Sequence, residues 1–217
     1  MNSYNVYKKE TAEKVAKNLL EIRAIKLAPE KPFTWSSGWK SPIYCDNRLA
    51  LSFPEVRNLI KTQLAEAISA HFKGVEAIAG VATAGIPQGA LVADLLSLPF
   101  LYVRSKPKGH GMENLIEGKI NAGQKVVVIE DLVSTGGSSL SAVAALKNAG
   151  AEVLGMAAIF TYGFSVADQN FNEAEVPLVV LSDYATLLQY AQKENIISED
   201  QLPVLNEWRN KPEVWGK

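Results

Sequence analysis

Short apolar runs rich in Val and Ile alternate with helix-like segments from residue 75 onward. The runs span residues 75–80, 99–104, 126–130, 153–161 and 176–181. Continuous apolar runs suit strands that are buried on both faces, and strands that alternate with helices form parallel sheets through right-handed crossovers. The pattern therefore predicts an α/β fold, with a doubly wound, mainly parallel sheet flanked by helices.

Two amphipathic helices are expected before this region. Residues 8–25 carry apolar side chains at helical spacing. A second helix is predicted from about residue 53, because Ser52 and Glu55 match an S-x-x-E capping box and Pro54 falls in the first turn. Residues 33–48 show neither helical nor strand periodicity and predict an irregular loop.

The length of the chain is compatible with one domain. It has 217 residues, of which 47% are hydrophobic, and this is enough to bury a sizeable core. No internal repeat or linker-like run divides the sequence. We therefore expect a single domain over residues 1–217, to which residues 1–50 add an N-terminal helix and the irregular loop.

Charge and cysteine content narrow the possible partners and compartments. Twenty-two Lys and Arg residues face 23 Asp and Glu residues, and this balance argues against nucleic-acid and membrane-surface partners. Cys45 is the only cysteine, which excludes an internal disulfide and fits a reducing compartment. The N-terminus lacks a signal-peptide pattern, and the apolar stretch at 91–103 is too short to cross a bilayer. A cytoplasmic protein is expected.

The strand predicted at 126–130 leads into a polar, glycine-containing string. Residues 130–139 read EDLVSTGGSS, and a helix-like segment follows them. In doubly wound sheets, ligands bind beyond the carboxyl ends of the strands. The hydroxyls of Ser134, Thr135 and Ser138, with the backbone N–H groups of the Gly-Gly pair at a helix N-terminus, suit a phosphate monoester.

Two acidic residues stand directly before this phosphate loop. Glu130 and Asp131 would repel a phosphate unless they bind another part of the same ligand. Carboxylates accept hydrogen bonds from vicinal hydroxyls, so a ribose 5-phosphate fits both halves of the string. The plainer alternative is that the acids are solvated turn residues and that Ser138 only caps a helix. The string matches neither the Walker A loop nor the dinucleotide-binding fingerprint.

The string IEDLVSTGGSS, residues 129–139, resembles the signature of type I phosphoribosyltransferases, which bind 5-phosphoribosyl 1-diphosphate (PRPP). The resemblance implies that Glu130 and Asp131 hold the ribose 2- and 3-hydroxyls and that the next residues wrap the 5-phosphate. Those residues are Leu132, Val133, Ser134, Thr135, Gly136, Gly137 and Ser138. It also implies Mg²⁺, bound through PRPP near Asp131 and not by the protein alone.

A second string, GVATAGIP at residues 80–87, also lies between a predicted strand and a helix. By itself it is typical of a plain strand-to-helix turn. Beside the first motif it resembles the pyrophosphate-binding loop of the same family. This resemblance assigns PRPP contacts to Thr83, Ala84 and Gly85.

A long loop at residues 104–118 carries three cations, one histidine and flexible glycines. It is either a solvated basic hairpin or a mobile lid whose cations match the charge of a departing pyrophosphate. By resemblance, Arg104, Lys108 and His110 match the family's catalytic loop and bind PRPP, with Asp131 as a further catalytic residue. Family members are homodimers in which this loop reaches the neighbouring subunit's site, so a homodimer with a shared lid is implied.

Residues 33–48, FTWSSGWKSPIYCDNR, resemble the base-binding hood of orotate phosphoribosyltransferases. We call this segment the hood. Orotate is a planar pyrimidine with a carboxylate, and the resemblance implies contacts with Phe33, Lys40 and Tyr44 of the hood and with Ser134 of the phosphate loop.

Three places depart from the family's pattern. Ser36 and the strand end at 160–162 stand where some members have a Lys and an Arg, respectively. Ser105 stands where members often have a Lys, and Lys106 is the next residue.

The resemblance implies transfer of the phosphoribosyl group from PRPP to orotate, giving orotidine 5'-monophosphate and pyrophosphate in pyrimidine biosynthesis. Two alternatives stay open from the sequence. A purine or uracil phosphoribosyltransferase would share the phosphate loop and differ in the hood, and a PRPP-sensing regulator would keep the motif without turnover.

Overall fold

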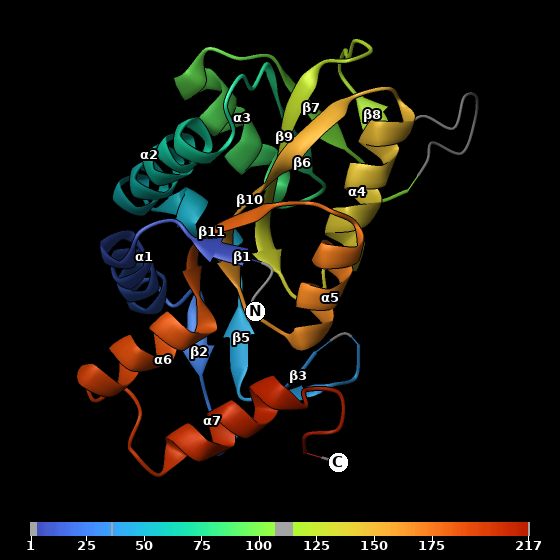
Figure 1. Cartoon of the computed structure of the whole chain (residues 1–217). Coiled ribbons are helices and arrows are strands. Elements are labelled where there is room, and N and C mark those ends of the chain that lie inside the picture. Colours follow the sequence, from blue (N-terminus) through green and yellow to red (C-terminus); the bar gives the residue numbers. More distant parts are fainter. Residues whose placement is uncertain (1–3, 36, 107–114, 217) are drawn as a thin grey trace.

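The computed structural model describes residues 4–35, 37–106 and 115–216, and its centre is a seven-stranded sheet (Figure 1). The strand order is β1-β11-β10-β9-β6-β7-β8. The strands are β1 (Tyr4–Val6), β6 (Ala77–Val81), β7 (Phe100–Val103), β8 (Ile116–Glu117), β9 (Lys125–Val133), β10 (Glu152–Thr161) and β11 (Leu178–Asp183). All neighbours are parallel except β7 and β8. The predicted mainly parallel sheet is confirmed, and the short edge strands β1 and β8 add to it.

Helices cover both faces of the sheet, as the doubly wound prediction requires. The helices are α1 (Lys9–Glu21), α2 (Pro54–His71), α3 (Gly85–Leu96), α4 (Gly137–Asn148), α5 (Ser165–Glu173), α6 (Tyr184–Lys193) and α7 (Gln201–Asn210). In Figure 1, α1, α2 and α3 lie on one side of the sheet and α4 and α5 on the other. Val127 and Ile129 of β9 belong to the core under the first group, whereas Val126 and Val128 belong to the core under the second. Successive side chains of a strand point to opposite faces, and both faces are buried here.

Strand β9 extends three residues beyond the predicted apolar run, which ended at residue 130. Pairing of β9 with β6 ends at Ile129, opposite Gly80, whereas its pairing with β10 continues to Val133, opposite Thr161. The acidic pair therefore lies within the strand, at the point where the sheet opens beside β6. The chain also reverses its direction of winding between β6 and β9, and this is the kind of place where doubly wound sheets bind ligands.

The hood corrects the expectation of a loop without strands. It contains β3 (Phe33–Thr34), β4 (Lys40–Ser41) and β5 (Ile43–Cys45), followed by the 3-10 helix η1 (Asn47–Ser52). β3 pairs with β4, and β5 pairs with β2 (Ile25–Leu27), both antiparallel. Strands of two or three residues are too short to show alternation in a sequence, and for this reason the periodicity missed them.

The predicted capping box of the second helix is wrong. Ser52 is the last residue of η1, and the N-cap of α2 is Phe53, which makes no side-chain cap. Pro54 does occupy the first position of the helix. A capping box needs its serine at the N-cap, and the 3-10 helix that runs up to α2 places Ser52 one residue too early.

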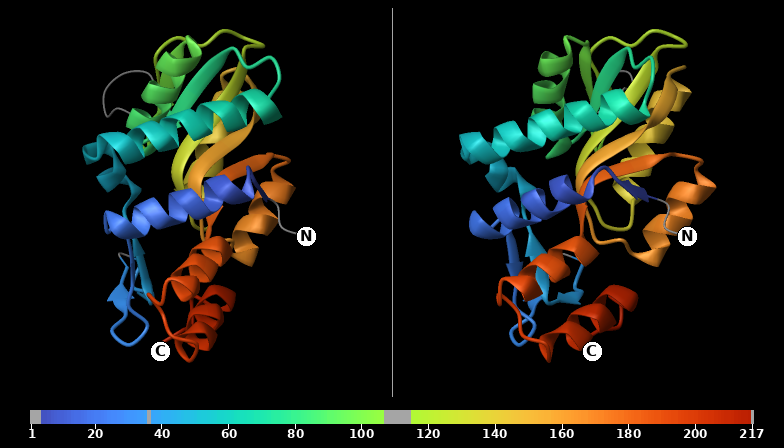
Figure 2. Two further views of the ribbon diagram at one scale, coloured as in Figure 1. Left: turned by 90° about the vertical axis from the view of Figure 1, so that its left-hand side faces the viewer. Right: turned by 60° about the vertical axis from the view of Figure 1, so that its left-hand side comes forward.

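The C-terminal helix α7 packs beside the hood strands (Figure 2). Trp208 of α7 is fully buried, and its Nε1 donates to the carbonyl of Lys40 at 3.2 Å. Arg209 donates to the carbonyls of Tyr162 and Gly163 at 3.2 and 2.9 Å. Helix α7 therefore joins the hood to the end of β10. Among the described residues, no helix has the length and hydropathy that a membrane span requires.

Candidate active site

A cavity of about 550 Å³ opens between the hood and the carboxyl ends of β9 and β10. Its size is typical of small-molecule sites. The lining residues are Thr34, Trp35, Ser37, Trp39, Tyr44 and Cys45 from the hood, Leu132, Ser134 and Thr135 from the end of β9 and the following loop, and Tyr162 after β10. The structure thus brings the hood and part of the phosphate loop into one cavity.

The acidic pair lies at the end of β9, beside this cavity. Glu130 is 6% exposed, and its carboxylate accepts hydrogen bonds from Ser139 Oγ at 2.9 Å and from the N–H of Asp131 at 3.1 Å. Burial and the adjacent Asp131 charge raise the pKa of Glu130, and burial also raises the pKa of Asp131. Buried like charges in contact disfavour each other's ionisation. The interpretation of these residues as solvated turn acids is therefore wrong for Glu130.

The phosphate loop leads directly into α4. The N-cap of α4 is Gly136, with φ +82°. A Cβ at this position would lie 2.8 Å from Cε2 of Phe171. Ser138 is inside the helix, so the alternative in which Ser138 caps it is wrong. The first N–H groups of a helix have no partner within the helix, and no side chain caps α4. This N-terminus can therefore receive an anion.

The second predicted loop, at Thr83 to Gly85, lies at the end of β6 and opens α3. A Cβ on Gly85 would lie 2.5 Å from the carbonyl oxygen of Ile129. Only glycine lets the start of α3 approach β9 this closely. The close packing places the loop of Thr83, Ala84 and Gly85 next to the strand that carries the acidic pair.

The lid is described at its two ends only. Lys108 and His110 lie outside the described residues. Arg104 follows β7, its N–H donates to the carbonyl of Leu115 at 2.8 Å, and its Nη1 contacts Glu117 Oε1 at 3.4 Å. The antiparallel pairing of β7 with β8 makes this segment the stem of a hairpin.

The predicted base contacts divide into two groups. Tyr44 and Ser134 line the cavity, whereas Phe33 and Lys40 are not among its lining residues. Phe33 packs against Tyr44, with ring centroids 5.7 Å apart, and Lys40 Nζ donates to the hydroxyl of Thr34 at 2.9 Å. The structure therefore places Phe33 and Lys40 behind residues that line the cavity.

Aromatic residues that the sequence analysis did not assign form much of the cavity wall. Tyr162 is 2% exposed, and its ring centroid lies 5.3 Å from Trp35 and 5.4 Å from Trp208. Burial raises the pKa of Tyr162 well above its usual value, so its hydroxyl stays protonated. Trp39 completes this wall. The aromatic content of the hood was a signal for Trp35 and Trp39. Tyr162 belongs to the strand end at 160–162, which the resemblance had marked as departing from the family's pattern.

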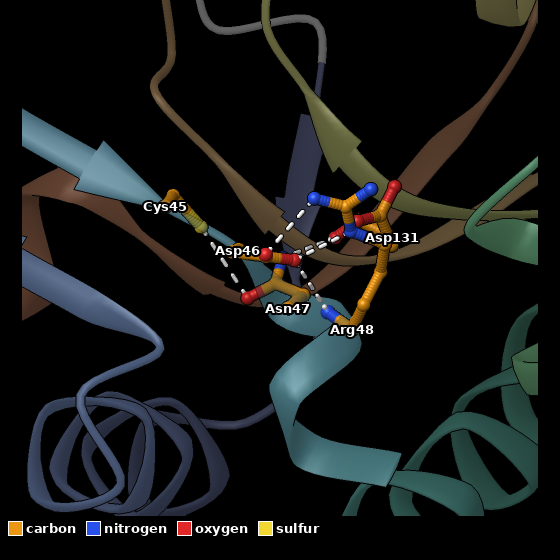
Figure 3. Close-up of polar contacts among 5 residues, drawn as sticks. All are labelled: Cys45, Asp46, Asn47, Arg48 and Asp131. Atoms are coloured by element: carbon orange, nitrogen blue, oxygen red, sulfur yellow. Dashed lines mark hydrogen bonds and ion pairs between the residues drawn. The ribbon is translucent and has the colours of Figure 1, made fainter.

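One cation lies near the acidic pair on the hood side. Arg48 donates through Nε and Nη2 to Asp46 at 2.6 and 2.9 Å, and its guanidinium is turned toward Asp131 (Figure 3). The hydrogen bonds from Arg48 lower the pKa of Asp46. In the described part of the chain, no group of three or more His, Cys, Asp or Glu could hold a metal. Two carboxylates fit a Mg²⁺ that takes most of its oxygens from a substrate.

Comparisons with known proteins agree with this arrangement. Residues 53–186 match the family model of the phosphoribosyl transferase domain. Orotate phosphoribosyltransferase of Porphyromonas gingivalis is 60% identical over 202 residues, which cover 93% of this chain and 96% of that protein. The Cytophaga hutchinsonii protein of the same name is 59% identical, covering 94% of this chain and 98% of the relative.

A solved structure shows the same fold. The crystal structure of orotate phosphoribosyltransferase from Aeropyrum pernix matches with a TM-score of 0.74 and 30% identity, covering 85% of this chain and 99% of that one. Sequence identity this high over nearly the whole length, with the matching domain and fold, shows that the chain belongs to the orotate phosphoribosyltransferase family.

Proposed function

We propose that the protein transfers the 5-phosphoribosyl group of PRPP to orotate, giving orotidine 5'-monophosphate and pyrophosphate in pyrimidine biosynthesis. The observation that carries this proposal is the shared cavity, in which the hood and the phosphate loop face each other. A base on the hood side would then meet a ribose held at the end of β9. The names of the relatives support the same reaction.

The ribose-phosphate half of PRPP fits the end of β9 and the start of α4. Glu130 and Asp131 accept hydrogen bonds from the 2- and 3-hydroxyls, and the loop from Leu132 to Ser138 receives the 5-phosphate at the N-terminus of α4. The loop from Thr83 to Gly85 donates backbone N–H groups to the diphosphate. Asp131 would help to hold a Mg²⁺ that binds through PRPP, and this ion would supply positive charge to the diphosphate.

The chemistry is glycosyl transfer, in which positive charge develops at the anomeric carbon as pyrophosphate leaves. Catalysis then rests on alignment of the two substrates and on charge stabilisation, without a covalent enzyme intermediate. Arg104 and Lys108 of the lid, together with His110, stabilise the departing pyrophosphate. A closed lid also keeps water away from PRPP.

Orotate fits the aromatic wall of the cavity. The described lining residues are uncharged, so ring stacking on Tyr44 and hydrogen bonds from hydroxyl groups such as that of Ser134 hold the base. Phe33 and Lys40 support this wall from behind, through Tyr44 and Thr34. This arrangement selects a planar base with hydrogen-bond acceptors.

A spectrophotometric assay with PRPP and Mg²⁺ tests the reaction. Orotate should be consumed, and uracil, hypoxanthine and adenine should not. Turnover of another base would show a phosphoribosyltransferase of different specificity. PRPP binding without turnover of any base would favour the PRPP-sensing regulator.

The proposal extends to a cytoplasmic homodimer in which each chain is one domain, residues 1–217, with a hood and N-terminal helix from residues 1–50. In this dimer, Lys108 of one chain acts at the site that contains Asp131 of the other. Lys108→Ala and Asp131→Ala would each be severely impaired alone. Random pairing makes about half of the dimers mixed, each with one intact site of two, so mixing should restore roughly a quarter of wild-type activity. No recovery, with mixed dimers confirmed by mass spectrometry, would show that the lid acts within its own chain.

A further inference from the structure

The buried side chain of Asn47 connects the hood to the acidic strand end. Asn47 is 0% exposed and is the first residue of η1, separated from the hood strand β5 by Asp46. Its Nδ2 donates to the backbone carbonyl of Asp131 at 2.7 Å, and its Oδ1 accepts from the thiol of Cys45 at 3.3 Å (Figure 3). The amide group of Asn47 therefore contacts Cys45, which lines the cavity, and Asp131, which precedes the lining residue Leu132.

The backbone turn that carries Asn47 is itself fixed. Asp46 accepts from the N–H of Arg48 at 3.2 Å and from the Arg48 guanidinium, while the N–H of Asp46 donates to the carbonyl of Ala24 at 2.8 Å. Cys45 pairs with Ile25 of β2. These bonds hold the turn on both sides, so the Asn47 amide has a defined orientation toward β9.

The position of Asn47 bears on the distance between the two substrates. Cys45 lines the cavity on the hood side, and Leu132, the neighbour of Asp131, lines it on the β9 side. Under the proposed function, the base binds to the first wall and the ribose to the second, and the new bond forms between them. A misplacement of about 1 Å between reacting atoms can lower a rate by roughly 100-fold.

We propose that Asn47 is a positioning residue that fixes the spacing between the base-binding hood and the ribose-binding end of β9. This inference rests on the proposed function. Asn47 contacts the backbone of Asp131, which leaves the Asp131 carboxylate for the ribose. Loss of the amide therefore affects the alignment of the two bound substrates more than the binding of either one.

Two variants and separate measurements of binding and turnover test the proposal. Asn47→Leu keeps the branched shape and the number of heavy atoms without hydrogen bonds, and Asn47→Ala leaves space that a water can fill. We expect kcat to fall roughly 10-fold or more. The Kd values of PRPP with Mg²⁺ and of orotidine 5'-monophosphate, measured by calorimetry, should stay within about threefold of wild type. Binding of both ligands also shows that each variant is folded.

Asn170 offers a matched control. Its Nδ2 donates to the carbonyl of Thr135 at 2.9 Å, so it supports the phosphate loop from α5 with the same kind of bond. Because this bond does not involve the hood, Asn170→Ala should weaken PRPP binding while kcat at saturating PRPP stays near wild type.

The outcomes separate this inference from the proposed function. Normal kcat in both Asn47 variants would overturn the positioning role. A kcat loss that only accompanies lost stability and lost binding of both ligands would overturn it too. In either case, turnover of orotate by the wild-type protein would still support the proposed reaction. Absence of orotate turnover in the wild-type protein would overturn both.

Discussion

The two walls of the cavity are built in different ways. The proposed ribose-phosphate wall comes from one contiguous segment, residues 130–138, of which Leu132, Ser134 and Thr135 line the cavity. This segment lies at the end of a strand whose core residues are fully buried. The hood wall combines non-strand residues, such as Trp35 and Trp39, with strands of two or three residues. Among the described residues, these strands pair within the hood or with β2. The first wall is held by the main sheet, whereas the second depends on side-chain contacts from distant parts of the chain.

Helix α7 shows how strongly the hood depends on distant contacts. Trp208 donates to the backbone carbonyl of Lys40, and Arg209 donates to the backbone carbonyl of Tyr162. These bonds join residues separated by 168 and 47 positions in the chain. Under the proposed function, this difference predicts that base selection at the hood and phosphate binding at the end of β9 can be disturbed separately.

Removal of the α7 anchor should give the largest effect. Trp208→Ala should destabilise the protein by about 3–5 kcal/mol, because it deletes a fully buried aromatic side chain. Thermal unfolding measures this loss. In the fraction that remains folded, KM for orotate should rise more than KM for PRPP.

Trp215→Ala is the matched control for this change, since Trp215 is only partly buried at the margin of the same core. It should cost clearly less stability than Trp208→Ala. Equal losses for PRPP and orotate in Trp208→Ala would contradict the separation of the two walls.

Removal of the Asp131 charge, at the proposed ribose-phosphate wall, should give the next largest effect. Asp131→Asn should preserve the fold but weaken PRPP binding by about 1.5–3 kcal/mol, because an accepting carboxylate is replaced by an amide. Calorimetric titration of PRPP with Mg²⁺ measures this change. Wild-type affinity in the variant would remove Asp131 from the ribose site.

The same variant should be more stable than wild type without ligand. Because burial raises the pKa of both acids, the folded state binds protons more tightly than the unfolded state. Stability contributed by these groups therefore falls as the pH rises above the usual carboxyl pKa. Asp131→Asn should raise the Tm, and the gain should be larger at about pH 8 than at about pH 5. A Tm gain that does not depend on pH would contradict this explanation.

A smaller effect is expected from the hood residues that lie behind the cavity wall. Phe33→Ala combined with Lys40→Ala should impair orotate kinetics and leave PRPP binding nearly intact, because the two side chains support Tyr44 and Thr34. Steady-state kinetics with each substrate varied in turn provide the measurement. Unchanged orotate kinetics with weaker PRPP binding would show that the hood assignment is wrong.

The smallest effect should come from a hydroxyl that supports the acidic pair. Ser139→Ala removes the bond from Ser139 Oγ to Glu130 and should weaken PRPP binding by about 1 kcal/mol. Ser141 is the control on the same helix, because its hydroxyl donates to the carbonyl of Gly137 within α4. Equal PRPP affinities in Ser139→Ala and Ser141→Ala would remove Ser139 from this role.

The sequence predicted the main sheet well because its strands are long enough to appear as apolar runs. The five runs became β6, β7, β9, β10 and β11, in the predicted parallel arrangement. The edge strands β1 and β8 have three and two residues. Such short segments carry no periodicity, and only pairing with β11 and β7 makes them strands.

The sequence by itself determined the segment at residues 130–138 that we assign to ribose-phosphate binding. Its acids, hydroxyls and glycines are neighbours in the chain, and the strand and helix on either side hold them in a fixed local geometry. Only the tertiary structure decided the base wall, where Tyr162 meets Trp35, Asn47 reaches Asp131 and Trp208 holds Lys40. These contacts join distant positions through packing and single hydrogen bonds, and a local sequence pattern contains no information about which distant residue fills the opposite side of a contact.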